Sequence, residues 1–328
     1  MEPFFKEQLA AVNMLNVFKS RQVVQRILPK TSLTFYRRLS DHLGAEVYIK
    51  HENHLPTHSF KVRGAVNFME QCPEEQIKNG VVVATRGNHG LAVAWAAQKR
   101  GVLCNVVVPE RNDPIINEMI LAYNATLIEH GSDFYEAQDY AEELSENAGY
   151  YYVRQGNEPL LITGIATMAL EILEDLPDLD VLVMPIGGGT GCAAVSMVIK
   201  QINPAVEIFG VQAEKMPSFY ESWKRGEKVT VPKAETVASG LAARSVFDLP
   251  FIILKDLVTD VVLLSEEELI DGVRLAIRYT QNLAEVAGAA AIKAAFALRE
   301  RIQGKKVVLV MTGGNISISS LASILCTV

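Results

Sequence analysis

The sequence predicts an α/β fold of two lobes, each a mostly parallel twisted sheet flanked by helices. Short apolar runs such as GVVVAT and DVLVMPI alternate with glycine-containing turns and helical segments. The middle of each run is apolar without alternation, which is typical of strands buried on both faces of a parallel sheet. Right-handed crossovers bring the turns that follow such strands to the carboxyl edge of the sheet, where open α/β sheets bind ligands.

The strand–turn–helix units fall into an early group, at about residues 80 to 130, and a later group from about residue 180. Two groups of strands with no repeat between them indicate two lobes. The expected strands are 80–85, 103–109, 125–130, 180–186, 206–214 and 305–311, and the expected helices are 91–101, 116–124, 133–149, 192–202 and 318–326.

The composition is that of an ordinary globular protein. The 328 residues are 49% hydrophobic and 21% charged, and the net charge of −7 argues against a nucleic-acid partner. No apolar run reaches the roughly 18 residues that a membrane span needs, and the first residues do not resemble a signal peptide. The four cysteines are scattered and form no C-x-x-C pair. This pattern favours reduced thiols and a cytoplasmic location.

The turn MPIGGGTGCAA follows an expected strand and opens an expected helix. Backbone amides of Gly187, Gly188, Gly189 and Thr190 can surround an anion there, since glycine permits close approach and a helix start favours negative charge. The same turn also satisfies G-x-G-x-x-A, with Glu214 near the end of the next strand. NAD binding is therefore a competing interpretation.

Two further turns offer polar side chains at strand ends. TRGNHG carries Thr85, Asn88 and His89, which suit a carboxylate but also suit ordinary helix capping. TGGNIS carries Thr312 and Asn315, and by itself it is also good turn chemistry.

The segment LPTHSFKVRGAVNF places Lys61 between Phe60 and Val62. Alone, this pattern fits a surface charge at a helix start better than a nucleophile. The nearby histidines are not expected to bind a metal, because Pro56 interrupts the helix that would align them and no H-E-x-x-H pattern is present. No G-x-S-x-G motif supports hydrolase chemistry.

Taken together, six motifs resemble the fold-type II pyridoxal-phosphate enzymes, and most closely the threonine/serine dehydratases and the related serine racemases. They occur in the family's order over nearly the whole chain. The motifs are SFKVRGA around Lys61, TRGNHG at 85–90, GGGTG at 187–191, TVASGLA at 236–242, AEVAGAAA at 284–291 and TGGN at 312–315. The resemblance implies the tryptophan synthase beta-like fold and pyridoxal 5′-phosphate as the cofactor.

Position by position, the resemblance also implies roles. Lys61 would form a Schiff base with the cofactor, Phe60 would lie against its ring, and Asn88 would meet its 3′-oxygen. The amides of 187–190 would hold the phosphate, and Thr312 would face the pyridine nitrogen. Thr85, Asn88 and His89 would grip the substrate carboxylate.

The family's domain organisation gives the expected boundaries. Residues 1–53 and 158–328 would form a large cofactor-binding domain, and residues 54–157 a smaller mobile domain that closes over the substrate. A homodimer or a higher homo-oligomer is expected through the resemblance alone.

The implied reaction is β-elimination from L-threonine or L-serine, which gives 2-oxobutyrate or pyruvate plus ammonia. A desolvated lysine can lose its proton and then act as nucleophile and base. A hydroxyl at Thr312 would not keep the ring nitrogen protonated as a carboxylate would, which favours loss of a β-substituent. The alternatives are a 3-hydroxyaspartate dehydratase, a serine racemase, an NAD-dependent oxidoreductase, or a binding protein that has lost turnover.

Several positions depart from the family pattern. Racemases usually have serine where Arg86 stands, and an arginine is a poor proton donor, so we expect little racemisation. Arg86 and Arg244 are candidates to recognise a second substrate carboxylate, although structural ion pairs or plain solvent exposure explain the two arginines better. Beyond Glu214 no carboxylate occurs before Glu221, so the divalent cation that some members bind is not expected. His58 occupies a position at which members of the family commonly have a small residue.

Overall fold

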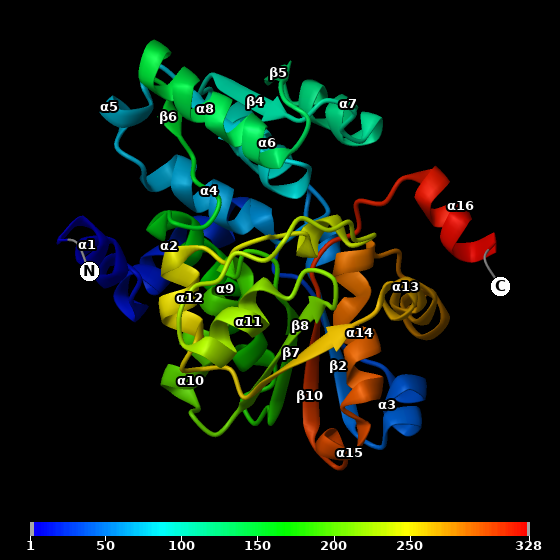
Figure 1. Ribbon diagram of the computed structural model, residues 1–328. Coiled ribbons are helices and arrows are strands. Elements are labelled where there is room, and N and C mark those ends of the chain that lie inside the picture. The colour runs from blue at the N-terminus through cyan, green and yellow to red at the C-terminus, as the bar shows by residue number, and fades with distance from the viewer. Residues whose placement is uncertain (1–2, 327–328) are drawn as a thin grey trace. The chain divides into compact units, whose positions relative to one another are not determined.

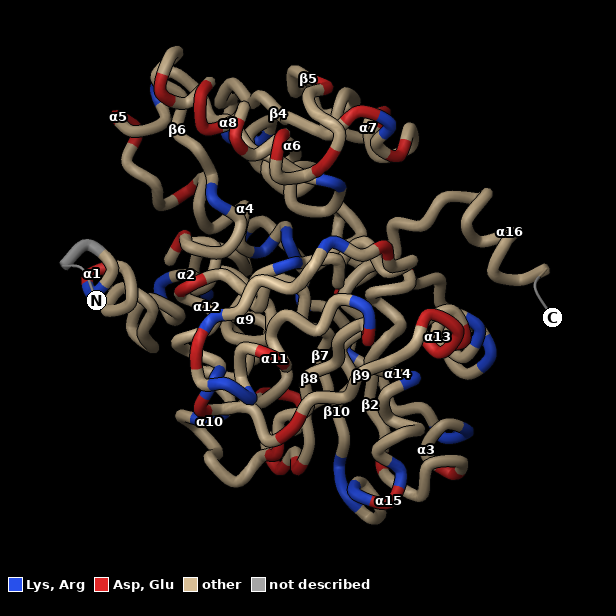
Figure 2. Tube along the Cα trace, viewed as in Figure 1, with Lys and Arg blue, Asp and Glu red and all other residues tan. Residues whose placement is uncertain are grey.

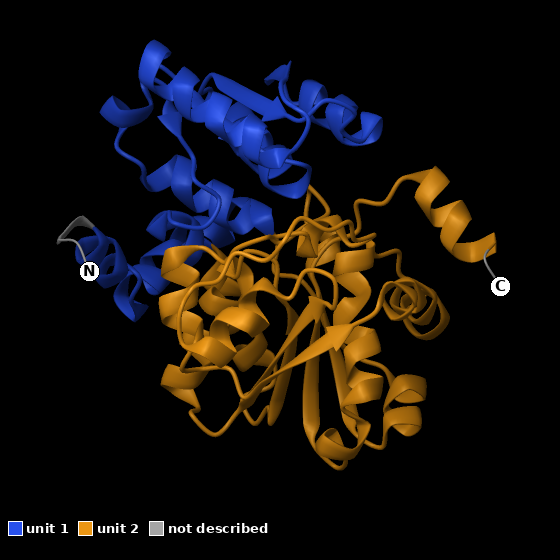
Figure 3. Cartoon of the chain, in the orientation of Figure 1, with its two compact units in different colours: residues 1–28, 61–164 blue, residues 29–60, 165–328 orange. Residues whose placement is uncertain are grey.

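The computed structural model describes residues 3–326, which form two compact units (Figure 3). Unit 1 comprises residues 1–28 and 61–164, and unit 2 comprises residues 29–60 and 165–328. The chain therefore changes units between Phe60 and Lys61 and again within one helix, after Gly164. The expected division differs in placing residues 1–28 with the larger unit and in setting the other boundaries at 54 and 157.

Unit 1 contains a four-stranded parallel sheet in the order β5-β4-β3-β6 (Figure 1). Side chains of Val82, Ala84 and Val107 pack with those of Ala137 and Ala141 from α8, on one face of the sheet. The other face of β4 meets α6. The strands are β3 Val81–Ala84, β4 Cys104–Val108, β5 Thr126–Glu129 and β6 Tyr151–Tyr152. The helices are α1 Pro3–Ala11, α2 Met14–Ile27, α4 Lys61–Gln71, α5 Glu74–Ile77, α6 Asn88–Arg100, α7 Pro114–Ala122 and α8 Phe134–Ala148.

Unit 2 contains a six-stranded sheet in the order β1-β2-β10-β7-β8-β9, in which only β1 is antiparallel. The strands are β1 Leu33–Phe35, β2 Glu46–His51, β7 Val181–Pro185, β8 Glu207–Ala213, β9 Asp260–Leu264 and β10 Lys306–Met311. The α-helices are α3 Arg37–Leu43, α9 Pro159–Asp175 (which begins in unit 1), α10 Thr190–Ile202, α11 Ser218–Arg225, α12 Asp248–Leu254, α13 Glu266–Thr280, α14 Val286–Ala297, α15 Arg299–Ile302 and α16 Ile318–Cys326. Two 3₁₀ turns cover Glu52–His54 and Ser239–Leu241.

The alanine-rich helix α14 packs along β10 and β7, and α13 packs on α14 (Figure 1). Small side chains let α14 approach the sheet closely, so its residues join β2, β7, β8 and β10 in one apolar core. These strands are apolar because both faces of the sheet are covered, as the sequence predicts, and the α/β fold class with mostly parallel sheets is confirmed. Charged residues lie mainly on helices and loops (Figure 2). None of the helices in residues 3–326 is long and apolar enough to cross a membrane.

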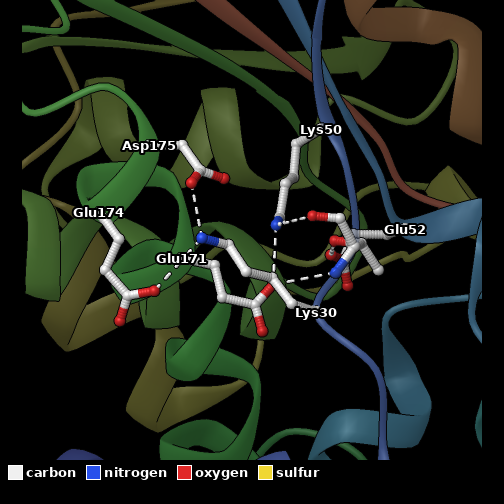
Figure 4. A network of polar contacts seen from close by, with 7 residues as sticks. Lys30, Lys50, Glu52, Glu171, Glu174 and Asp175 are labelled. Carbon is white, nitrogen blue, oxygen red and sulfur yellow. Dashed lines mark hydrogen bonds and ion pairs between the residues drawn. The ribbon is translucent and has the colours of Figure 1, made fainter.

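Lys50, near the end of β2, is a fully buried charged residue that points away from this core and toward α9 (Figure 4). Its ammonium donates to Glu171 Oε2 at 2.7 Å and to the Thr31 carbonyl at 2.8 Å, and the side chains of Lys50 and Glu171 are 0% and 2% exposed. The Thr31 hydroxyl donates to Glu52 Oε1 at 2.7 Å. This network ties β2 and the start of the 52–60 segment to α9.

Candidate active site

In unit 2, the glycine-rich turn after β7 lies against two segments that are distant in sequence. A Cβ placed on Gly187 would be 2.3 Å from the Gly240 carbonyl oxygen, and one on Gly191 would be 2.9 Å from the Phe60 ring. Contacts this short mean that a side chain at Gly187 or Gly191 would force the neighbouring segment to move. The turn 187–191, the TVASGLA segment and Phe60 therefore meet at one end of β7.

The turn opens α10, a helix of 13 residues that begins at Thr190. Gly189 has φ +95°, and Thr190 is 2% exposed. Successive backbone amides at a buried helix start, with no side chain in the way, form a suitable cradle for a phosphate group.

The end of β10 joins this assembly through the segment that precedes Lys61. The Phe60 amide donates to the Thr312 carbonyl at 3.2 Å, and Ser59 and Gly313 form an isolated β-bridge. The Gly314 amide donates to the His58 carbonyl at 2.9 Å. Thr312 is 6% exposed, so its side chain is buried beside Phe60's backbone.

Two features of the 57–60 segment indicate a constrained, functional turn. His58 adopts φ +53°, a left-handed conformation that is uncommon for a residue with a Cβ. The Asn315 amide donates to the Thr57 carbonyl at 2.9 Å, while the buried Thr57 hydroxyl has no hydrogen-bond partner among the described residues. An unpaired buried hydroxyl is costly, and it is common at sites that receive a ligand.

Unit 1 carries Lys61 as the first residue of α4, half-buried and directly after Phe60. His89 lies in the same unit, 2% exposed, and its Nε2 donates to the Val153 carbonyl at 3.2 Å. Burial, and then the positive charge of Lys61, lower the pKa of His89 to about 3. His89 is therefore neutral at physiological pH and lies within electrostatic reach of Lys61.

The TRGNHG turn links β3 to α6 in unit 1. The Thr85 hydroxyl accepts hydrogen bonds from the amides of Gly87 at 2.9 Å and Gly90 at 3.1 Å, which orders the turn from inside. Thr85 is only 1% exposed, whereas Asn88 is half-buried at the first position of α6. The exposed Arg86 makes no hydrogen bond or ion pair within residues 3–326. Arg244, in unit 2, donates from Nε to the Val231 carbonyl at 3.3 Å.

Each unit thus brings together part of the predicted set. Unit 2 gathers Phe60, the 187–190 cradle and Thr312, and unit 1 gathers Lys61 with the 85–89 turn. The described residues contain no group of three or more His, Cys, Asp or Glu side chains that would hold a metal ion. Sequence reasoning assigned no role to Thr57 or Lys50, although a lysine directly after the apolar residues VYI of the expected strand EVYIKHEN was a usable signal for the buried ion pair.

Comparison with known protein families decides the assignment. The family described as "Pyridoxal-phosphate dependent enzyme" matches residues 24–313. The chain belongs to this family. Pyridoxal-phosphate-dependent enzymes with similar sequences include the L-threonine ammonia-lyase of Thermotoga maritima, 37% identical over 96% of this chain and 78% of the relative. The catabolic L-threonine dehydratase of Escherichia coli K12 is 31% identical over 94% of each chain.

Solved structures of the same fold agree. Threonine deaminase isoform 2 from Solanum lycopersicum superposes with a TM-score of 0.89 at 29% identity, over 96% of this chain and 95% of the other. Maize serine racemase superposes with a TM-score of 0.90 at 25% identity, over 96% and 97%. The protein is therefore a pyridoxal-phosphate-dependent lyase of fold type II, in the threonine/serine dehydratase family.

The residues present fit the cofactor. The cradle at 187–190 suits its phosphate, and the unpaired Thr57 hydroxyl marks a place where a buried polar atom lacks a partner. NAD, the competing interpretation of the glycine-rich turn, is not supported by the family that the chain belongs to.

Replacing Gly187 with alanine is expected to weaken phosphate recognition. The new Cβ would press on the Gly240 backbone, and overpacking of this kind costs about 1–3 kcal/mol, which corresponds to about 5- to 150-fold in affinity. We would measure the affinities for pyridoxal phosphate and for pyridoxal by equilibrium dialysis. The preference for the phosphorylated form should fall in G187A. The matched control is G210A. Gly210 lies in β8, and a Cβ there would be 2.3 Å from the Ile186 side chain. An equal loss of preference in this control would contradict a phosphate-specific role for Gly187.

Proposed function

We propose that the protein is an ammonia-lyase that converts L-threonine to 2-oxobutyrate and ammonia, and L-serine to pyruvate and ammonia. The observation that carries this proposal is the hydroxyl-bearing Thr312 at the end of β10, hydrogen bonded through its carbonyl to Phe60 beside Lys61. The names of the relatives, L-threonine ammonia-lyase and L-threonine dehydratase, support it.

In this proposal each residue of the chain has a distinct task. Lys61 holds the cofactor and then, as a free amine, removes the proton from Cα of the amino acid. When bound, pyridoxal phosphate would supply the electron sink for the negative charge that proton removal leaves on Cα. Amides of 187–190 hold the phosphate group. Thr312 provides a neutral hydroxyl, which cannot keep a ring nitrogen protonated as a carboxylate would, and this favours elimination over reprotonation.

The substrate carboxylate is assigned to the TRGNHG turn. Because the Thr85 hydroxyl is already bonded to two amides of the turn, Thr85 positions the turn, and Asn88 with the amides at the start of α6 makes the contact. His89, kept neutral and bonded to Val153, holds the turn against β6 without adding charge.

Release of a 2-oxo acid tests the proposal. Purified protein loaded with pyridoxal phosphate is incubated with L-threonine or L-serine, and the released 2-oxo acid and ammonia are measured. The two products should form in equal amounts. Binding of threonine without any product would support a protein that has lost turnover. Formation of the D-isomer in excess of the 2-oxo acid would favour the racemase alternative.

Arg86 supplies a prediction about the substrate. An arginine beside a helix start is unfavourable, because the dipole there is already positive, and Arg86 has no counter-ion among the described residues. We propose that it receives a second carboxylate, so that the wild type also acts on 3-hydroxyaspartate. R86S should lower kcat/KM for 3-hydroxyaspartate by about 10-fold or more and leave threonine within about 3-fold.

The matched control for this prediction is R26S, which removes an exposed arginine from α2 in the same unit. A wild type that is inactive on the diacid would overturn the role of Arg86 and leave threonine turnover as the function. Arg244, whose guanidinium is bonded to Val231, is the weaker candidate for the same contact.

We also propose a homo-oligomer, a dimer by analogy with the family, and a cytoplasmic location. Three of the four cysteines are buried and all are free, which suits a reducing compartment. Light scattering on the eluting protein would measure the oligomeric state directly.

A further inference from the structure

Unit 1 contains a pocket that belongs to none of the turns discussed above. It lies between α1, α2, the α4–α5 junction, β6 and the start of α9, and has a volume of about 240 Å³. Its polar lining includes Gln8, Asn16, Tyr151, Glu158 and Thr163. Sites for drug-sized ligands have volumes of roughly 300–1,000 Å³, so this pocket suits a smaller molecule.

Glu158 brings a carboxyl group into the pocket with no cation beside it. The residue is 8% exposed, and its carboxyl oxygens accept from Tyr151 OH at 2.7 Å and from the Leu160 amide at 3.1 Å. The described residues that line the pocket include no lysine, arginine or histidine. Arg154, whose charge acts on Glu158 from outside the lining, is paired with Glu142 at 3.8 Å. Burial raises the pKa of Glu158 above its usual range, the direction expected of a desolvated carboxyl group without a counter-ion.

A second acceptor in the pocket lacks a donor. Gln8 Oε1 is buried without a hydrogen-bond partner among the described residues. Two donors in the lining are bonded elsewhere: Asn16 Nδ2 donates to the Ala11 carbonyl at 2.8 Å, and the Thr163 hydroxyl to the Pro159 carbonyl at 3.0 Å. The pocket therefore offers a carboxyl group and an amide oxygen, and what it lacks is a hydrogen-bond donor with positive charge.

We propose that this pocket binds a small primary ammonium compound, with the N–H groups donating to Glu158 and Gln8. An ammonium group supplies three donors and the missing charge, and its short alkyl chain would lie against Leu160 and Pro159. A zwitterionic amino acid fits less well, because the lining offers no cation for its carboxylate.

Calorimetric titration of the cofactor-loaded protein with propylammonium chloride tests the assignment. The wild type should bind saturably, and E158Q, which keeps the shape of the side chain and its bond from Tyr151, should bind about 10-fold more weakly or worse. Q8L should also weaken binding. The matched control is E146Q, at an exposed glutamate of α8 outside the pocket, and it should bind as the wild type does.

Two comparison ions separate the proposal from simple charge effects. Tetramethylammonium carries the same charge without N–H donors, and potassium carries the charge without an alkyl chain. At equal ionic strength, both ions should bind at least about 10-fold more weakly than propylammonium. Absence of saturable binding to the wild type would overturn the proposal. So would binding that E158Q and Q8L leave unchanged, because the amine would then be reacting at another site, such as the cofactor. Neither result depends on whether threonine is the substrate.

Discussion

Replacing Lys61 with alanine is expected to abolish turnover of threonine and serine. In the proposed function the lysine would hold the cofactor covalently and then serve as the base at Cα, and a positioned base alone contributes about 10²–10⁴-fold to a rate. We therefore expect kcat to fall by about 10³-fold or more. The loss should be measured as 2-oxo acid release under saturating pyridoxal phosphate, so that weaker cofactor binding does not account for it.

A matched control for K61A is K78A, at an exposed lysine just beyond α5 in the same unit. It should retain wild-type turnover. K61R is a second test, since arginine keeps the charge but does not lose its proton, and it should be as inactive as K61A. Turnover in K61A within about 10-fold of the wild type would show that another group is the base.

Replacing Lys50 with methionine is expected to destabilise unit 2 severely. Glu171 would remain in the core at 2% exposure without its ammonium partner, and breaking a buried ion pair costs about 3–5 kcal/mol. Trp223 lies in unit 2 and its indole donates to the Lys255 carbonyl at 3.1 Å. Urea unfolding followed by Trp223 fluorescence in a W95F background would therefore report on this unit.

The double variant K50M/E171L distinguishes an unpaired charge from lost packing. Because both charges are gone, it should regain most of the lost free energy of unfolding. The control is R37M, which removes an exposed pair with Asp41 in the same unit and should cost less than about 1 kcal/mol. If K50M/E171L lost as much free energy of unfolding as K50M and E171L lose in sum, the result would contradict this account of Lys50.

The elements that could be predicted from the sequence are those marked by a local pattern of residues. The parallel strands 81–84, 104–108, 181–185 and 306–311 are buried on both faces, and such strands are visible as apolar runs. The glycine-rich turn was equally visible, since only close approach explains so many consecutive glycines. The short edge strands β1 and β6 were not predicted, because two or three residues give no periodicity.

Other features depend on contacts between distant segments. The position of Phe60 against Gly191 and Thr312 follows from the sheet order β2-β10-β7, which no local pattern specifies. The inward-facing hydroxyl of Thr85 looked like a ligand contact in the sequence, and only the geometry showed that the turn itself uses it. The membership of residues 1–28 in unit 1 likewise depends on the packing of α2 on α4.

The central claim is that Lys61 carries pyridoxal phosphate, and chemical trapping tests it most directly. The purified protein, loaded with the cofactor, would be treated with borohydride, digested and analysed by mass spectrometry. We predict that the reduced cofactor is found on the peptide that contains Lys61, and that the visible band of the untreated protein disappears on reduction. A label on another lysine, or an unlabelled Lys61 peptide after saturation with the cofactor, would contradict the account.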